Sequence, residues 1–273
     1  MGVLLALAAS ASWGAGDFLG GLASRARSAI LVMAVSQPVG LVALAIATLA
    51  RWQAPPGAAV AWACPAALLG VLGLAAFYRG MATGSISVVA PIAGAAAVIP
   101  VVAGLLGGDR PSTLQGIGFA CAIGGVAGTS WEGAGRRLAQ GVGYTLIALL
   151  GLGGYFVFLH RAGSEDFLWA AFLFRATSTP IVWLAVLRVR PSWEGLGPAL
   201  PVLAAIGILD TGGNTLFAAA SSRGLVSVTS VLASLNPVVT VLLAHAYLRE
   251  RLQAWQYGGI ALTLAGAALI SVG

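Results

Sequence analysis

Two charged side chains lie in the middle of long apolar stretches, where charge is costly. Arg175 lies within the apolar run 167–187, Asp210 lies within the run 198–221, and Asn214 follows Asp210 by about one helical turn. A charged residue at the middle of a membrane span costs roughly 2.5–3.5 kcal/mol on insertion scales, so each such residue is a candidate for a functional site.

The chemistry of this pair depends on whether the two side chains meet. Consecutive antiparallel helices can bring Arg175 and Asp210 together, and an ion pair would keep Asp210 charged and suppress proton exchange. Without a cationic partner, a desolvated Asp210 could carry a coupling proton, and Asp210→Asn would then abolish pH-dependent uptake. A released Arg175 would instead bind a carboxylate or phosphate through two hydrogen bonds. A structural ion pair and a substrate site both stay open.

A second group of candidates consists of residues that interrupt apolar runs. Asn236-Pro237 lies midway along its run, where proline removes one backbone hydrogen bond and frees a carbonyl one turn earlier, near Leu232. A kink with a spare acceptor at the midplane suits a hinge or a ligand contact. Pro100 and Pro91 interrupt an earlier run, and the correspondence of Pro100 with Pro237 favours a role in helix shape.

Three further residues are candidates for a cavity wall. Trp13 is deep in the first apolar run, and a cavity wall, protein packing and lipid contact are all open for it. Asp17 is near the end of that run, so we expect its side chain to reach toward the membrane interface. Gln37 lies within the second run, where helix packing is favoured over binding.

Several kinds of site are not indicated. Cys64 and Cys121 fall inside apolar runs with no CxxC and no companion histidine, so neither a metal nor a disulfide is predicted. No serine has a matching histidine and aspartate, and Gly14-Ala15-Gly16 lacks the strand and lysine of a phosphate loop. The sequence therefore predicts no enzyme, no metal and no cofactor.

The composition is that of a membrane protein. Of the 273 residues, 59% are hydrophobic and only 8% are charged, against roughly 25% charged in soluble domains. Mean hydropathy is +0.95. Basic residues outnumber acidic ones by 14 to 8, which in a soluble domain would suggest nucleic acid. Here the arginines stand between apolar runs and are typical of topology signals and lipid headgroup contacts.

The chain contains ten apolar runs of about the 20 residues that a membrane span requires. They are Gly2–Leu22, Ala29–Ala50, Ala58–Gly80, Ser85–Gly107, Ser112–Ser130, Gly141–His160, Phe167–Leu187, Pro198–Ser221, Leu225–Tyr247 and Leu252–Val272. The connections between them are too short to form a separate domain.

The second half of the chain repeats the signals of the first half in the same order. Gly84, Pro100, Asp109, Gln115, Gly118 and Gly125 correspond to Gly224, Pro237, Glu250, Gln256, Gly259 and Gly266. We expect two copies, residues 1–137 and 138–273, with five spans each. Because five is an odd number, the second copy enters the membrane upside down. Such inverted repeats are typical of secondary transporters.

These signals resemble the drug/metabolite transporter superfamily, and its EamA-type members in particular. The matching residues are Trp13-Gly14, Tyr78-Arg79-Gly80-Met81-Ala82, Ser87-Val88-Val89-Ala90-Pro91, Asn236-Pro237-Val238, Arg249-Glu250-Arg251-Leu252, Gly258-Gly259 and Gly266. The resemblance implies a ten-helix carrier that works by alternating access around a central cavity. It also implies cytoplasmic termini, whereas the excess of arginine in the odd-numbered connections places both termini outside. The first copy has Gly108-Asp109-Arg110 where Gly-Glu-Arg is typical.

We therefore predict an all-α polytopic protein of the cytoplasmic membrane, with ten transmembrane helices in two inverted-topology five-helix repeats. As a secondary transporter it would move a small polar or amphipathic metabolite, amino-acid-like or a drug, and its partners would be that molecule and membrane lipid. The predicted substrate-binding residues are Trp13, Arg175, Asp210, Asn214 and Asn236, and the predicted helix breaks are Pro91, Pro100 and Pro237. A channel or a non-transporting membrane protein is the alternative. A homodimer stays open, and nucleic acid is not an expected partner.

Overall fold

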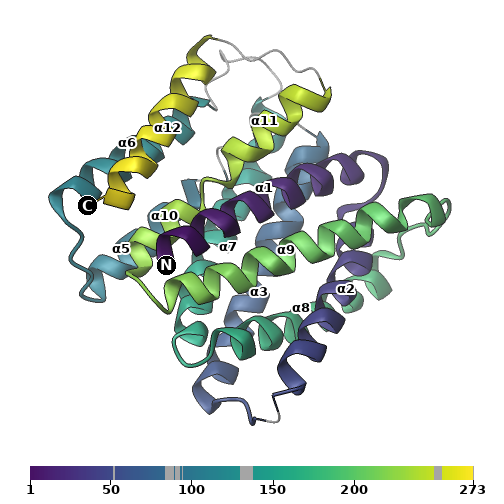
Figure 1. Cartoon of the computed structure of the whole chain (residues 1–273). Coiled ribbons are helices and arrows are strands. Elements are labelled where there is room, and N and C mark those ends of the chain that lie inside the picture. Colours follow the sequence, from purple (N-terminus) through teal and green to yellow (C-terminus); the bar gives the residue numbers. More distant parts are fainter. Residues whose placement is uncertain are drawn as a thin grey trace.

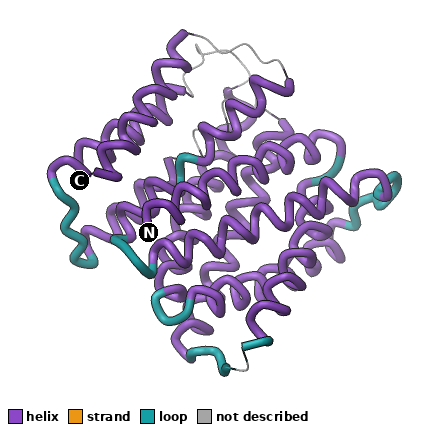
Figure 2. Tube along the Cα trace, in the orientation of Figure 1, coloured by secondary structure: helices purple, strands orange, loops and turns teal. Residues whose placement is uncertain are grey.

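The structure is a computed structural model of the chain, and it describes residues 1–51, 53–83, 89, 93, 95–129, 138–248 and 254–272. Within these ranges the regular secondary structure is entirely helical, and short connections join the helices (Figures 1 and 2). The all-α architecture predicted from the composition is confirmed.

The helices follow the predicted apolar runs. In the first half they are α1 (Gly2–Ala26), α2 (Ala29–Leu49), α3 (Gly57–Thr83), the 3-10 helix η1 (Ala95–Ala97), α5 (Val98–Leu106) and α6 (Thr113–Thr129). In the second half they are α7 (Leu138–Gly163), α8 (Phe167–Val189), the 3-10 helix η2 (Gly197–Ala199), α9 (Leu200–Ser221), α10 (Val226–Ala233), α11 (Asn236–Leu248) and α12 (Ala254–Val272). α1 continues for one turn beyond its predicted end.

Seven described segments are long and apolar enough to cross a membrane. They are Gly2–Ala26, Ala29–Leu49, Gly57–Thr83, Tyr144–Gly163, Phe167–Val189, Gly197–Ser221 and Val226–Leu248. α6 and α12 are apolar but shorter, and the fourth predicted run is described only in part, as η1 and α5. These elements account for the ten predicted runs, and the chain is a multi-pass membrane protein.

Side-chain caps fix where several of the helices begin, as at α8 and α6. Asp166 Oδ1 accepts hydrogen bonds from the N–H groups of Leu168 at 2.9 Å and Trp169 at 3.1 Å, in the first turn of α8. Before α6, the Ser112 N–H donates to Gln115 Oε1 at 3.0 Å and the Gln115 N–H donates to Ser112 Oγ at 3.1 Å. These bonds satisfy N–H groups that have no partner within the helix, so each helix begins at a polar residue beside its apolar run.

The contacts between the two halves are those of two copies related by a two-fold axis. α3 packs along α7, and α1, the counterpart of α7, packs along α9, the counterpart of α3 (Figure 1). α2 contacts α8 and α9, while its counterpart α8 contacts α2 and α3. The halves therefore interleave. The predicted boundary after residue 137 adjoins residues 130–137, which lie outside the described ranges, and it stays a prediction.

α6 and α12 pack together to one side of the other helices (Figure 1). A side-chain carbon at Gly118 would lie 2.8 Å from the Gly266 carbonyl oxygen, and one at Gly125 would lie 2.6 Å from the Gly259 carbonyl oxygen. Close packing of this kind requires glycine. The order of these contacts shows that α6 and α12 run antiparallel. Because the two helices are counterparts, the two copies run in opposite directions, as five spans per copy predict.

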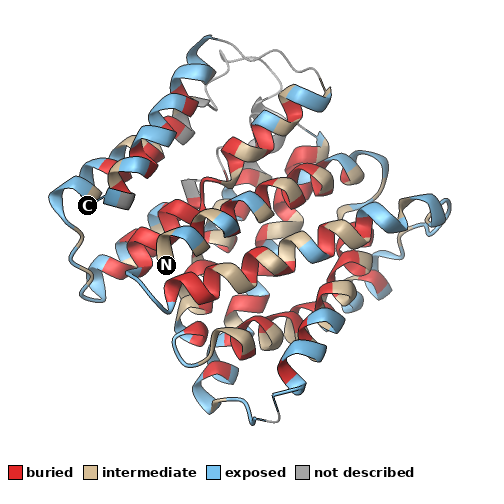
Figure 3. Cartoon of the chain, viewed as in Figure 1, coloured by how far each residue is buried: buried red, intermediate tan, exposed pale blue. Residues whose placement is uncertain are grey.

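The outside of the bundle is apolar. Buried residues face the interior of the bundle, and the outward faces of the helices are exposed (Figure 3). Large hydrophobic side chains on these outward faces include Ile46 on α2, Leu72 on α3, Leu150 on α7 and Leu184 on α8. An apolar exterior of this extent would be a liability in water, but it matches the hydrocarbon core of a bilayer. These faces form the lipid-contacting surface.

Candidate functional site

A cavity lies between the two halves, and its walls come from α1, α2, α3, α7, α8, α9 and the start of α11. The volume of the cavity is about 70 Å³, which is room for about five water molecules. The residues predicted to contact substrate all line it: Trp13, Arg175, Asp210, Asn214 and Asn236. Asp17, Gln37 and Ser234 line it as well.

Arg175 on α8 and Asp210 on α9 form an ion pair in the cavity wall. Arg175 Nη2 donates to Asp210 Oδ2 at 2.7 Å, so of the two arrangements that the sequence leaves open the structure has the paired one. The Arg175 side chain is 1% exposed and the Asp210 side chain 18% exposed. The guanidinium is therefore covered by protein, whereas the carboxylate still faces the cavity. The carboxylate without a cationic partner that the proton-carrier role requires is therefore not found at Asp210.

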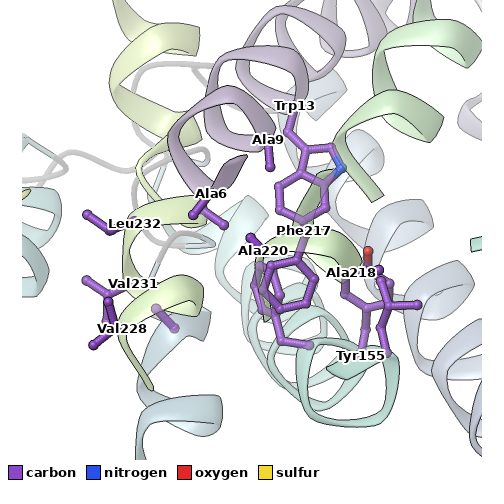
Figure 4. Packing of buried hydrophobic residues seen from close by; sticks show 14 of the residues in the cluster. Ala6, Ala9, Trp13, Tyr155, Phe217, Ala218, Ala220, Val228, Val231 and Leu232 are labelled. Carbon is purple, nitrogen blue, oxygen red and sulfur yellow. The ribbon is translucent and has the colours of Figure 1, made fainter. Parts of the chain in front are cut away.

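Asn214 joins three helices at the cavity. Its Oδ1 accepts a hydrogen bond from Trp13 Nε1 on α1 at 3.0 Å and another from Tyr155 Oη on α7 at 2.8 Å. Trp13 Nε1 also donates to the backbone carbonyl of Asp210 at 3.2 Å. The Trp13 and Phe217 ring centres lie 5.8 Å apart, with Tyr155 nearby (Figure 4). Hydrogen bonds and ring packing hold the indole in place, so Trp13 is buried in the protein and forms a fixed part of the cavity wall.

Asp17 lies inside the bundle, and the prediction that it reaches the interface is wrong. Because α1 continues to Ala26, Asp17 is two turns from the helix end, and it is 8% exposed. Its Oδ2 accepts a hydrogen bond from Asn236 Nδ2 at 2.5 Å. Within the described residues, Asp17 takes part in no ion pair. The cavity therefore contains a carboxylate whose partner is a neutral amide.

Two further polar atoms of the cavity wall lack partners in the described part of the chain. Gln37 Oε1 and Ser234 Oγ are both buried without a hydrogen bond. A buried polar atom left without a partner costs about 1–3 kcal/mol, and in a polar cavity water or a ligand can supply the missing bond. Gln37 thus faces the cavity, although its sequence position favoured helix packing. Sequence reasoning missed Ser234 and Tyr155, and the presence of a polar group within an apolar run was the available signal for both.

The ninth apolar run is interrupted directly before Pro237, by a break between two helices rather than by a kink within one helix. α10 ends at Ala233 and α11 begins at Asn236, so Pro237 lies in the first turn of α11. Proline is tolerated there because its missing N–H would have no helical partner. The carbonyl expected to be free near Leu232 accepts from the Leu235 N–H at 3.4 Å. The break places the Asn236 side chain at the cavity.

The fourth run changes its helical form at the corresponding place. The 3-10 helix η1 precedes α5, and Pro100 lies in the first turn of α5. α5 contacts α10, so the two interrupted segments meet. Pro91, the third predicted break, lies outside the described residues.

Two polar contacts tie the halves together at one end of the bundle. Arg51 Nη1 and Nη2 donate to Asp166 Oδ1 and Oδ2 at 3.0 and 2.8 Å. Asp109 Oδ2 accepts from the Ser227 N–H at 2.9 Å and so caps the start of α10. Partial burial raises the pKa of Asp166, but the hydrogen bonds from Arg51 and from the first turn of α8 outweigh it and hold the pKa below its usual value. The hydrogen bond between Arg51 and Asp166 also raises the pKa of Arg51.

Comparisons with known proteins agree with this geometry. Residues 1–131 and 139–272 match the model of a family described as "EamA-like transporter family". A solved structure titled "Crystal structure of protein" aligns with a TM-score of 0.71 and 18% sequence identity, over 97% of this chain and 96% of that one. At this identity the likeness shows the fold alone. A search of the curated proteins finds no match.

Proposed function

Because the chain belongs to the EamA-like transporter family, which is a family of transporters and not of enzymes, we propose that this secondary transporter carries a small polar or amphipathic metabolite by alternating access. The observation that carries the proposal is the cavity between the halves, whose wall combines an ion pair, a second carboxylate and aromatic rings. Such a wall holds a polar group and an apolar body together. Amino-acid-like molecules and drugs have this character.

The cavity residues divide into two roles. Asp210, Asn214 and Asn236 offer polar groups to a substrate, and Trp13 supplies an aromatic surface. Arg175 is covered by protein and acts by neutralising Asp210. All of these groups belong to a single chain, so the proposed transport does not require a homodimer.

The contacts at one end of the bundle support a gate on that side. Ser227, which Asp109 caps, precedes Ser234 at the cavity by about 10 Å along the chain, at 1.5 Å per helical residue. The Arg51–Asp166 pair joins the halves at the same end. Rupture of both contacts would free this end of the cavity, and α5 and α10 meet where a rocking motion would take place. Motion of this kind around a fixed central site is alternating access.

The proposal is tested in two steps. Purified protein in detergent is screened by thermal unfolding against amino acids, amines and nucleobases, because a ligand that binds only the folded state raises the apparent stability. A molecule that stabilises the protein is then used in counterflow with proteoliposomes. A carrier predicts that unlabelled substrate inside the liposomes accelerates uptake of labelled substrate. Uptake that is unaffected by the internal substrate would indicate a channel and contradict alternating access.

A further inference from the structure

The cavity contains more acid than base. Asp17, Asp210 and Arg175 are the charged residues that line it within the described part of the chain. The wall therefore has two carboxyl groups and one guanidinium, and the guanidinium pairs with Asp210. A cation that enters the cavity can form an ion pair with the remaining carboxyl group, that of Asp17.

The positive charge of the wall is not accessible to a substrate. The Arg175 side chain is 1% exposed, its guanidinium bonds to Asp210, and its central carbon lies 5.4 Å from the centre of the Phe174 ring. A substrate carboxylate or phosphate would thus meet two carboxylates and no free guanidinium. The exposed charge of this cavity disfavours anions.

Asp17 has the geometry of a cation subsite. Asn236 Nδ2 donates to one of its carboxylate oxygens, and the other oxygen has no hydrogen-bond donor among the described residues. The Asn236 side chain also has an amide oxygen, for which no hydrogen bond is found in the described part of the chain. An ammonium group has donors and no acceptors, so it complements these two oxygens.

We propose that the cavity binds an organic monocation with an apolar body. Its ammonium group donates to the second carboxylate oxygen of Asp17 and to the amide oxygen of Asn236, and its body contacts the aromatic rings of Trp13, Phe156 and Phe174, which line the same space. Aromatic faces attract cations and also accept an apolar body, so both ends of such a molecule are matched. This inference rests on the proposed function and narrows its substrate to a charge class.

A charge series on the unaltered protein tests the inference. Phenethylamine, phenylalanine, 3-phenylpropanol and 3-phenylpropionate share a phenyl body and present, in turn, a cation, a zwitterion, a neutral group and an anion. Binding is measured at pH 7 in detergent by titration calorimetry. We expect phenethylamine to bind at least about tenfold more tightly than 3-phenylpropanol, and 3-phenylpropionate to bind most weakly. The absence of a preference for the amine, or the tightest binding by the anion, overturns the inference.

Two matched variants test whether the preference for the amine arises at Asp17. Asp17→Asn removes the charge at nearly constant shape, and we expect it to abolish the roughly tenfold preference for the amine. Glu194→Gln removes a carboxylate from the exposed connection between α8 and α9, outside the cavity, and should leave the preference unchanged. A preference that survives in Asp17→Asn overturns the assignment of the subsite. If Asp17→Asn fails to fold, the charge series on the unaltered protein still decides the question.

The two proposals fail in distinguishable ways. Binding of the amine without counterflow would remove the carrier proposal and leave the cation site standing. Counterflow of an anionic or neutral molecule, with the same rate in Asp17→Asn as in the unaltered protein, would keep the carrier and overturn the cation site.

Discussion

Two helix interfaces occupy equivalent places in the two halves, α1 against α9 and α3 against α7. Each brings a glycine against a bulkier residue of the other helix: Gly213 faces the indole of Trp13, and Gly73 faces Leu152. A side-chain carbon at either glycine would overlap that neighbour. Both interfaces thus require a glycine at the same position, and their packing follows one plan.

The polar contacts of the two interfaces differ. Between α1 and α9, Ser12 Oγ donates to the Leu209 carbonyl at 2.6 Å. Between α3 and α7, Gly151 lies against the Leu69 carbonyl and has no side chain to donate. The helix packing is therefore repeated in the two halves, whereas the hydrogen bond between the helices is found at one interface and not at its counterpart.

The same asymmetry extends to the cavity. Asp210 precedes Gly213 by three residues and Asn214 follows it, whereas the same positions of α3 hold Gly70 and Leu74. All four residues beside these paired glycines line the cavity. One wall is thus polar and its symmetry-related wall is apolar. The repeated helices thus enclose the cavity, and the polar residues that only one of the two copies has form the candidate site.

Breaking the ion pair of the polar wall is expected to have the largest effect. Asp210→Ala leaves the buried Arg175 without a counter-charge, which costs about 3–5 kcal/mol for a fully buried pair and somewhat less here, because Asp210 is 18% exposed. We expect loss of the monodisperse peak in size-exclusion chromatography. The double variant Arg175→Met/Asp210→Leu removes both charges and should recover folding without transport. A double variant as unstable as Asp210→Ala would contradict this account.

Substitutions at the two equivalent interfaces are expected to have intermediate effects on stability, and the effects should differ in size. Gly151→Ala places a carbon 2.7 Å from Gly73 Cα and 2.8 Å from the Leu69 oxygen. These are backbone atoms that cannot turn aside, so we expect a loss of about 1–3 kcal/mol in the free energy of unfolding. Ser12→Ala, in the equivalent interface, loses one hydrogen bond and about 1 kcal/mol. Thermal unfolding of both variants checks the order, and a larger loss in Ser12→Ala would show that packing does not dominate.

The smallest effect is expected at the exposed Arg51–Asp166 pair. Asp166 has a folded-state pKa below its unfolded value of about 3.9, so the pair contributes stability above that pH and loses it as the pH falls through the folded-state pKa. Arg51→Gln should lower the unfolding temperature by about 2 °C or less between pH 5 and 8, since exposed ion pairs contribute little. The difference should vanish at low pH. A difference that grows on acidification would contradict the assigned pKa direction.

The sequence alone predicts much of this arrangement. Apolar runs locate the helices, the doubled order of Gly, Pro and acidic residues predicts the repeat, and mid-span charge identifies Arg175 and Asp210. Polar residues are costly in a membrane span and therefore rare, so each one that does occur there indicates a candidate site. The cavity residues predicted in this way do share one cavity.

Two features could not be predicted because they depend on where helices end. The apolar run ends near Leu22, but α1 continues through Ser24 to Ala26, which moves Asp17 from the expected interface to the interior. A proline in an apolar run is equally compatible with a kink and with a new helix start. The structure has the second form at Pro237, and only tertiary packing distinguishes the two.

Access to Ser234 from each side of the membrane tests the central claim most directly. Cys64 and Cys121 are first replaced by alanine, and Ser234→Cys is then treated with a membrane-impermeant maleimide in right-side-out and in inside-out vesicles. Glu165→Cys, at the exposed α7–α8 connection, serves as a one-sided control. The account predicts that the cysteine at position 234 reacts from both sides and that the cysteine at position 165 reacts from one side only. Reaction of the cysteine at position 234 from a single side, however long the exposure, would contradict a cavity that opens to both sides in turn.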